Sequence, residues 1–427
     1  MQYLSYQEAK AFSTPFFLLD ENHLANQVDL IHKAFEKYWV NGLVAYSVKT
    51  NSLPYLAKVL YNEGVAAEVV SEDEFDFINK VAQFGGDCLN SDKQQKIKVF
   101  GRSGGGNIVC NGPIKHESWI DKILTQKCYL NIDSKRELVL VEKYARQHPD
   151  EIIKVGLRVN NDIEDIFPNA STAGIKGSRF GFSYETGELG HAIEYLRSLN
   201  TVKITGLHLH ISTNLRSLAV YQYIVSKFDE IVKRYSLSDI EYLDAGGGFY
   251  GEVPNKPQWA DYISTISKEL SDRGYMPESL KLIIEPGVSL LSGCFSYYTR
   301  VEDVKDTARS HFVVLDGSRN HIDPLMHKTI NSYFYSIEQQ NKTPIFNRPQ
   351  ILVGYTCLEY DSFFELTQER LLEVGDMVRF DKVGAYTLTF SPLFISWFPT
   401  VYSINNGKIS IVRDRWTADE FLQKSKF

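Results

Sequence analysis

The sequence predicts an α/β protein, built as a (β/α)8 TIM-type barrel joined to a mostly antiparallel β domain. Short apolar runs typical of strands alternate with helical patterns, and eight such units fit within roughly 250 residues, as a barrel of this type requires. After Gly287 the apolar runs no longer alternate with regular helices, which indicates a separate β domain. We therefore expect the barrel over 36–288 and the β domain over 1–35 and 289–427.

The expected elements follow from apolar periodicity. A strand over 15–19 precedes a helix from 21 to 38, and further helices are clearest at 53–63, 72–80, 221–234 and 260–273. The eight barrel strands are expected at 43–49, 65–70, 108–110, 128–132, 154–159, 204–210, 241–243 and 281–284. The β domain combines strand 16–19 with strands at 289–298, 311–315, 350–353, 377–380, 400–403 and 408–412.

Composition excludes several classes of protein. The chain has 427 residues, and its net charge of −7 comes from 46 basic and 53 acidic residues, which argues against a nucleic-acid-binding surface. The five cysteines are scattered without a CxxC pair, so we expect reduced thiols and no metal site. The absence of a signal peptide or a long apolar run predicts a cytoplasmic protein that does not enter a membrane.

A glycine-rich segment over 101–106 interrupts the alternation of strands and helices. It lacks the Gly-Lys-Ser/Thr ending of a nucleotide-binding loop, so a flexible insertion is favoured over a phosphate site.

Chemically useful side chains collect where the expected barrel strands end, and this is where such barrels build active sites. The first strand delivers Lys49, whose amine either reaches water along the apolar stem or reacts with an aldehyde in a pocket. The remaining strand ends contribute Glu68, Arg158, His208, His210, Gly246, Gly247, Gly248 and Glu285.

Each of these residues has a structural explanation when it is considered alone. Three consecutive glycines form a tight turn or expose backbone N–H groups to an anion. An inward histidine is often a core residue, but it can also stack on a flat ring. A buried Glu285 is costly without a cationic partner, and a protonated ring nitrogen is such a partner. Together these features predict a site for pyridoxal 5′-phosphate and reactions at an amino-acid α-carbon.

The motifs also resemble those of the fold-type III pyridoxal-phosphate decarboxylases, which include diaminopimelate, ornithine and arginine decarboxylases on an alanine-racemase-like barrel. The matching stretches are Tyr46-Ser47-Val48-Lys49-Thr50-Asn51, Gly206-Leu207-His208-Leu209-His210, Asp244-Ala245-Gly246-Gly247-Gly248-Phe249, Glu285-Pro286-Gly287, Gly354-Tyr355-Thr356-Cys357 and Gly384-Ala385-Tyr386. They occur in the family's order over most of the chain.

The resemblance implies a role for each matching position. Lys49 would carry the internal aldimine, His210 would stack on the ring, and Glu285 would pair with the ring nitrogen. Cys357 would protonate the carbanion in the site of a partner subunit, so a homodimer with shared active sites is implied. The residues implied around the cofactor are Glu68, Arg158, Thr213, Gly246, Gly247, Gly248, Gly287 and Tyr386.

Three departures from the family pattern bear on the substrate. Val288 and Asp323 stand where diaminopimelate decarboxylases have arginines, and neither can replace a bidentate arginine clamp on a carboxylate. Leu358 replaces the acid that follows Cys357, although Glu359 and Asp361 are nearby. We therefore expect Asp323, Glu359 and Asp361 to face the substrate, and diaminopimelate is disfavoured.

Three functions remain open at this point. The first is a decarboxylase for an amino acid or an amino-acid conjugate. The second is an amino-acid racemase or epimerase on the same barrel, with Cys357 as the second acid–base group opposite Lys49. The third is a non-catalytic relative that binds partners, which the retained Lys49 and cofactor glycines disfavour.

Overall fold

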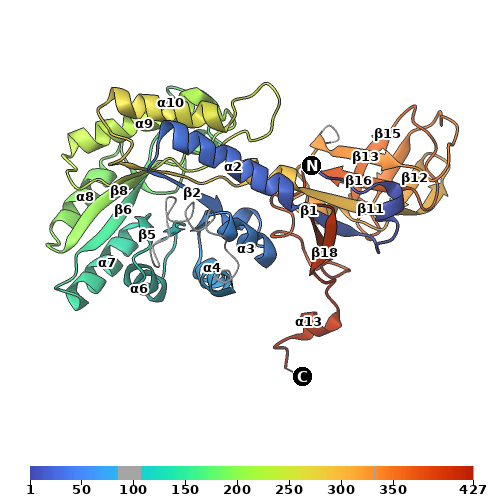
Figure 1. The fold of residues 1–427 in the computed structure, drawn as a ribbon, viewed down its shortest axis with the longest axis horizontal. Coiled ribbons are helices and arrows are strands. Elements are labelled where there is room, and N and C mark those ends of the chain that lie inside the picture. The colour runs from blue at the N-terminus through green and yellow to red at the C-terminus, as the bar shows by residue number, and fades with distance from the viewer. Residues whose placement is uncertain (85–106, 330–331, 427) are drawn as a thin grey trace. The chain divides into compact units, whose positions relative to one another are not determined.

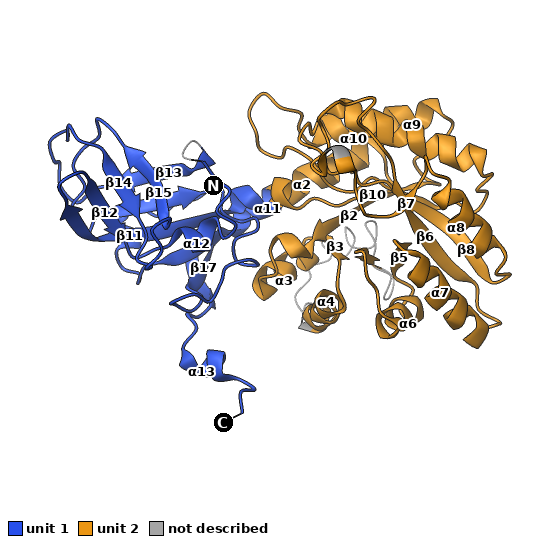
Figure 2. Cartoon of the chain, turned by 180° about the vertical axis from the view of Figure 1, so that it is seen from behind, with its two compact units in different colours: residues 1–26, 291–427 blue, residues 27–290 orange. Residues whose placement is uncertain are grey.

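The computed structural model describes residues 1–84, 107–329 and 332–426. The glycine-rich segment 101–106 lies outside the described residues. The chain divides into two compact units, formed by 27–290 and by 1–26 together with 291–427 (Figure 2). None of the helices in the described ranges is long and apolar enough to cross a membrane.

Unit 2 is a closed barrel of eight parallel strands, which confirms the predicted fold class. The pairing of β5 with β6 closes the ring in the order β5-β4-β3-β2-β10-β9-β8-β6, and the short β7 (Phe182–Ser183) pairs with β6. The eight strands are β2 (Gly42–Ser47), β3 (Ala66–Val69), β4 (Ile108–Cys110), β5 (Tyr129–Ile132), β6 (Ile153–Asn160), β8 (Val202–His208), β9 (Tyr242–Asp244) and β10 (Lys281–Ile284).

Helices surround this ring and connect its strands (Figure 1). Their buried faces carry apolar residues at helical spacing, as in α9, where Val220, Tyr221, Ile224, Val225 and Phe228 are buried. The helices are α2 (Glu21–Tyr38), α3 (Pro54–Asn62), α4 (Glu72–Phe84), α6 (Glu117–Thr125), α7 (Lys135–Gln147), α8 (Glu188–Arg197), α9 (Leu218–Arg234) and α10 (Trp259–Asp272), with short 3-10 turns η1 (Val48–Thr50) and η2 (Gly174–Lys176).

Unit 1 is a mixed, mostly antiparallel sheet that includes the N-terminal strand, as predicted. Its main path is β15-β14-β12-β11-β1-β17-β18, and β16 joins β11 to β13. β1 pairs with β17 in parallel, and so does β12 with β14. The strands are β1 (Phe16–Asp20), β11 (Phe295–Asp306), β12 (His311–Leu315), β13 (Phe334–Glu338), β14 (Gln350–Val353), β15 (Ser362–Leu366), β16 (Met377–Asp381), β17 (Thr400–Asn405) and β18 (Lys408–Arg413).

The expected strand at 289–298 was wrong over its first half. Residues 288–294 form two short helical turns, α11 (Val288–Leu291) and η3 (Ser292–Cys294), and the strand begins only at Phe295. Strands β13 and β15 were not predicted. The remaining short helices are α1 (Tyr6–Ala9), α12 (Arg319–Ile322) and α13 (Ala418–Leu422).

Tyr242 packs inside the barrel. Tyr242 is buried in a cluster with Leu43, Ala45, Val109 and Ile283. A Cβ added at Gly206 would lie 1.9 Å from Cζ of Tyr242, and one at Gly156 would lie 2.0 Å from its hydroxyl oxygen. The glycines on β6 and β8 therefore provide the space that this ring occupies.

We predict that Gly206→Ala lowers the free energy of unfolding by about 1–3 kcal/mol, because the new methyl group overpacks the barrel against Tyr242. Gly190→Ala on α8 is the control: its Cβ would lie 3.1 Å from the Tyr235 hydroxyl, and alanine favours a helix. Urea titration of both variants measures the difference. Equal stability of the two variants would contradict this account of the interior.

Candidate active site

Lys49 lies in the turn η1 just after β2, since the strand itself ends at Ser47 and not at the lysine. Its Nζ donates to Oε2 of Glu68 at 2.5 Å and lies 3.4 Å from the Ser47 hydroxyl. The Lys49 side chain is 39% exposed, whereas that of Glu68 is only 1% exposed. A buried carboxylate therefore holds an amine that remains accessible, which differs from a lysine that extends freely into water.

Glu285, which follows β10, is connected to Glu68 by one amide. Nδ2 of Asn111 donates to Oε1 of Glu285 at 2.5 Å and to Oε1 of Glu68 at 3.2 Å. The amide is in turn oriented by Asn131, whose Nδ2 donates to Oδ1 of Asn111 at 2.9 Å. Hydrogen bonds thus run without interruption from the Lys49 amine to the Glu285 carboxylate.

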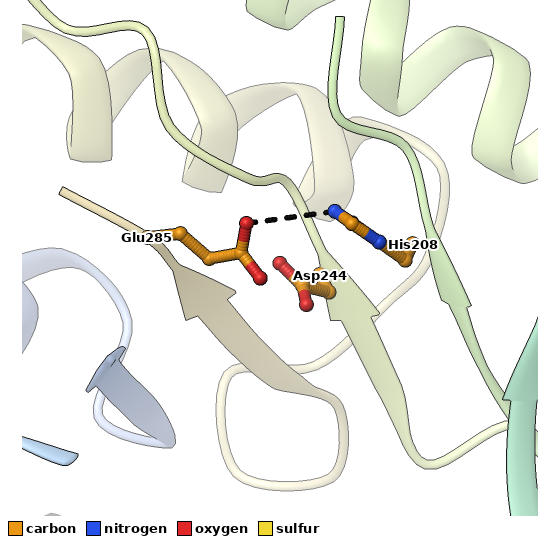
Figure 3. Close-up of side chains that lie close together, drawn as sticks. All are labelled: His208, Asp244 and Glu285. Carbon is orange, nitrogen blue, oxygen red and sulfur yellow. Dashed lines mark ion pairs between the residues drawn. The ribbon is translucent and has the colours of Figure 1, made fainter. Parts of the chain in front are cut away.

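Glu285, Asp244 and His208 lie close together at the ends of β10, β9 and β8 (Figure 3). Each offers an atom within 4.8 Å of the others, and His208 Nε2 lies 3.5 Å from Oε2 of Glu285. Burial alone would raise the pKa of Glu285, but His208 and Lys49 outweigh it and hold that pKa below its ordinary value. Burial and the neighbouring Glu285 raise the pKa of Asp244 well above its ordinary value.

His210 lies beyond the end of β8, two residues later than the strand itself extends. Its Nδ1 accepts a hydrogen bond from the Gly247 N–H at 3.2 Å, which places the ring proton on Nε2. Burial outweighs the opposing effect of Glu285 and lowers the pKa of His210 to about 3. The imidazole is therefore a neutral, flat surface near Glu285.

Two of the glycines predicted to surround a phosphate lie where a side chain would clash with neighbouring residues. Gly246 has φ +67°, and a Cβ there would lie 2.5 Å from that of His210. A Cβ at Gly287 would lie 2.4 Å from Oγ1 of Thr50, a buried hydroxyl that has no hydrogen-bond partner among the described residues. The face of the His210 imidazole could support a flat ring. The glycine backbone and the Thr50 hydroxyl could donate hydrogen bonds to a phosphate.

Arg158 and Thr213 are positioned by local contacts. Arg158, on β6, donates to Oδ2 of Asp133 at 3.3 Å, and its guanidinium lies 4.7 Å from the centre of the Phe180 ring. Thr213 accepts a hydrogen bond from the Leu215 N–H at 3.1 Å. The Arg158 charge is thus directed by a carboxylate on the neighbouring strand end.

The other predicted site residues belong to unit 1. Cys357 and Glu359 are exposed. Tyr386 has φ +56° and stacks on Phe390 with 5.5 Å between the ring centres. The buried Asp361 accepts hydrogen bonds from the Ser318 and Thr356 hydroxyls and from the Arg319 and Thr356 N–H groups.

Asp323 in unit 1 is buried and fully engaged by its own loop. Its carboxylate accepts hydrogen bonds from Nε and Nη2 of Arg319 at 2.9 and 2.8 Å, and from the backbone N–H groups of His327 and Lys328 at 3.0 Å each. Asp323 and Arg319 therefore form an ion pair within this loop.

Asn111, Asn131, Asp133 and Asp244 were not among the predicted site residues. Asn111 and Asp133 directly follow β4 and β5, and Asn131 lies within β5. The same principle that selected Lys49 and Glu285, a polar side chain at the carboxyl end of a barrel strand, would have found them.

Three comparisons place the chain among known proteins. The family model "Pyridoxal-dependent decarboxylase, pyridoxal binding domain" matches residues 22–292. Diaminopimelate decarboxylase of Aquifex aeolicus is 25% identical over 98% of this chain and 93% of its own length. L-glutamyl-[BtrI acyl-carrier protein] decarboxylase of Niallia circulans is 26% identical over 97% of this chain and 94% of its own.

A solved structure has the same fold. Diaminopimelate decarboxylase of M. jannaschii in complex with L-lysine superimposes with a TM-score of 0.81 at 22% identity, covering 99% of this chain and 94% of that one.

We predict that the His210 imidazole stays neutral down to about pH 4, with Nδ1 unprotonated. As pH falls from about 6.5 toward 3, the unfolded chain takes up a proton at His210 that the folded chain does not, so this group lowers the free energy of unfolding. Nitrogen-15 NMR of the imidazole measures both the tautomer and the titration. A midpoint near 6.5 would contradict the assigned environment.

Proposed function

This chain belongs to the pyridoxal-dependent decarboxylases, and we propose that it removes the α-carboxylate of an amino acid, free or conjugated, other than diaminopimelate. It is a carboxy-lyase, and its cofactor is pyridoxal 5′-phosphate. When bound, the cofactor supplies an aldehyde that condenses with amines and a ring that accepts electrons from the α-carbon.

The observation that carries the proposal is the hydrogen-bonded connection between Lys49 and Glu285. Lys49 offers an accessible amine that Glu68 holds at 2.5 Å, and Glu285 offers a buried carboxylate. We assign Lys49 to the cofactor aldehyde and Glu285 to the ring nitrogen. His210 then provides the flat surface for the ring, and the backbone from Gly246 to Gly248 receives the phosphate.

The substrate assignment depends on whether an arginine is available to bind a second carboxylate of the substrate. Val288 carries none, and the Asp323 carboxylate neutralises Arg319 within the same loop. A second carboxylate on the substrate would therefore have no free arginine at these two positions, which disfavours diaminopimelate. The Niallia circulans relative is named for a glutamyl group on a carrier protein, so conjugated amino acids belong among the candidates.

Among the acids near Cys357, we assign substrate contact to Glu359. Asp361 and Asp323 already accept hydrogen bonds inside unit 1, whereas Glu359 is exposed. We propose that Cys357 and Glu359 act in the site of a second subunit, Cys357 as the proton donor after carbon dioxide leaves and Glu359 as the acceptor for a substrate amine.

We predict that Lys49→Ala abolishes covalent attachment of the cofactor. Borohydride treatment of the wild-type protein should fix pyridoxal phosphate to the peptide that contains Lys49, and release of carbon dioxide should fall by roughly 10³-fold or more in the variant. Lys58→Ala, which removes an exposed lysine from α3, should change neither result. Attachment elsewhere in the wild-type protein would exclude the assigned chemistry.

We predict that Glu359→Gln lowers kcat/KM by about 10–100-fold for amino acids with a distal amine, because the charged hydrogen bond is lost. Substrates without that amine should be unaffected. Mass spectrometry of carbon dioxide loss across free amino acids, diaminopimelate and a carrier-bound glutamyl group measures this. A uniform decrease for all substrates would show that Glu359 does not select the amine.

We predict that Lys49→Ala and Cys357→Ala proteins, each inactive alone, recover activity when their subunits are mixed. In a mixed dimer one of the two sites has both residues intact, so about a quarter of the wild-type activity is expected after random exchange. Continued inactivity of the mixture, with exchange verified by native mass spectrometry, would place both residues in one subunit's site.

A further inference from the structure

Asp244 is a second buried carboxylate beside Glu285, and the proposed function gives it no task. Asp244 is fully buried and Glu285 is 5% exposed. One oxygen of each acid and one ring nitrogen of His208 lie within 4.8 Å of one another, and the carboxyl groups face each other in Figure 3. Two carboxylates this close cannot both be ionised cheaply when they are buried, so the pair needs either a cation or a shared proton.

The oxygens of the pair are already occupied by hydrogen-bond donors of the protein. The Gly246 N–H donates to Oδ1 of Asp244 at 3.0 Å, and Nδ2 of Asn131 donates to Oδ2 at 3.2 Å. Nδ2 of Asn111 donates to Oε1 of Glu285 at 2.5 Å. Amide hydrogens directed at three of the four oxygens suit a proton between the two acids better than a metal ion.

The surroundings of the two acids are unequal, and this decides which of them holds the proton. Glu285 faces the imidazole of His208 and feels the charge of Lys49, both of which favour a carboxylate. Burial is the largest of the effects that raise the pKa of Asp244, and the negative charges of the adjacent Glu285 and of Glu68 raise it further. The proton therefore resides on Asp244.

We propose that Asp244 is a protonated positioning residue, which donates a hydrogen bond to Glu285 and leaves the pair with a single negative charge directed at the cofactor ring nitrogen. The identity of that ring rests on the proposed function. Asp244 does not touch the ring; it acts through Glu285. Tyr242 supports the arrangement, because its hydroxyl donates to Oδ1 of Asn131 at 2.8 Å and so orients the amide that contacts Asp244.

The protonation of Asp244 can be tested without cofactor, by infrared difference spectroscopy of the apoprotein. We expect a carbonyl stretch of a protonated carboxylic acid near neutral pH that disappears in Asp244→Asn. Asp376→Asn is the matched control, since Asp376 is a buried aspartate of unit 1 that accepts hydrogen bonds from the Gln340 and Glu373 N–H groups. The band should persist in that variant. A spectrum without a band that depends on Asp244 would overturn the proposal.

The positioning role has its own test in the binding of pyridoxal phosphate. Asp244→Asn keeps an N–H donor for Glu285 without a charge, whereas Asp244→Leu has a similar size and no donor. We expect the dissociation constant to change by less than about 3-fold in the asparagine variant and to rise roughly 10-fold or more in the leucine variant. The absorbance of the bound cofactor should also shift only in the leucine variant.

Failure of the positioning role can be distinguished from failure of the proposed function. Equal dissociation constants and spectra for the asparagine and leucine variants would overturn the positioning role. A wild-type protein that binds no pyridoxal phosphate would instead contradict the proposed function, and the infrared result on the apoprotein would still decide the protonation of Asp244.

Discussion

The site depends on the Asn111 amide, which holds two buried carboxylates in one arrangement. Its Nδ2 contacts both Glu68 and Glu285, and these acids contribute to opposite ends of the proposed cofactor site. Buried carboxylates are costly unless donors satisfy them, and a fully satisfied network is correspondingly rigid. The distance between the reactive amine of Lys49 and the acid for the ring is therefore set by the protein before a ligand binds.

The barrel makes this arrangement possible because its parallel strands all end on the same side. Neighbouring strand ends supply Glu68, Asn111, Asn131, Asp244 and Glu285, and each side chain contacts one from another strand. Below them Tyr242 packs inside the barrel, and its hydroxyl reaches up to Asn131. The same ring thus contributes to the packing of the core and to the orientation of the polar network.

The fold could be predicted from the sequence because apolar periodicity reports burial directly. All eight barrel strands were expected within a few residues of their positions, although the strand that carries His208 ends two residues earlier than expected. The β domain was harder to predict. Segment 288–294 is apolar but helical, and the exposed Phe334 and Tyr335 give β13 no clear alternation of buried and exposed residues.

The candidate site could be predicted only in part, for a related reason. Lysine, histidine and glutamate at strand ends are unusual enough to attract attention, whereas Asn111 and Asn131 resemble ordinary strand or turn residues. Their importance comes from pairs far apart in sequence, such as Asn111 with Glu285. Asp323 and Asp361 look available in the sequence, and the structure shows that both are buried and hydrogen-bonded within unit 1.

We infer that this network holds Glu285 as a carboxylate that would pair with the ring nitrogen of the cofactor. Nitrogen-15 NMR of the protein loaded with ring-labelled pyridoxal phosphate tests it most directly. We expect a protonated ring nitrogen in the wild-type protein around neutral pH, and loss of that proton in Glu285→Gln. An unprotonated ring nitrogen in the wild-type protein would exclude this role for Glu285.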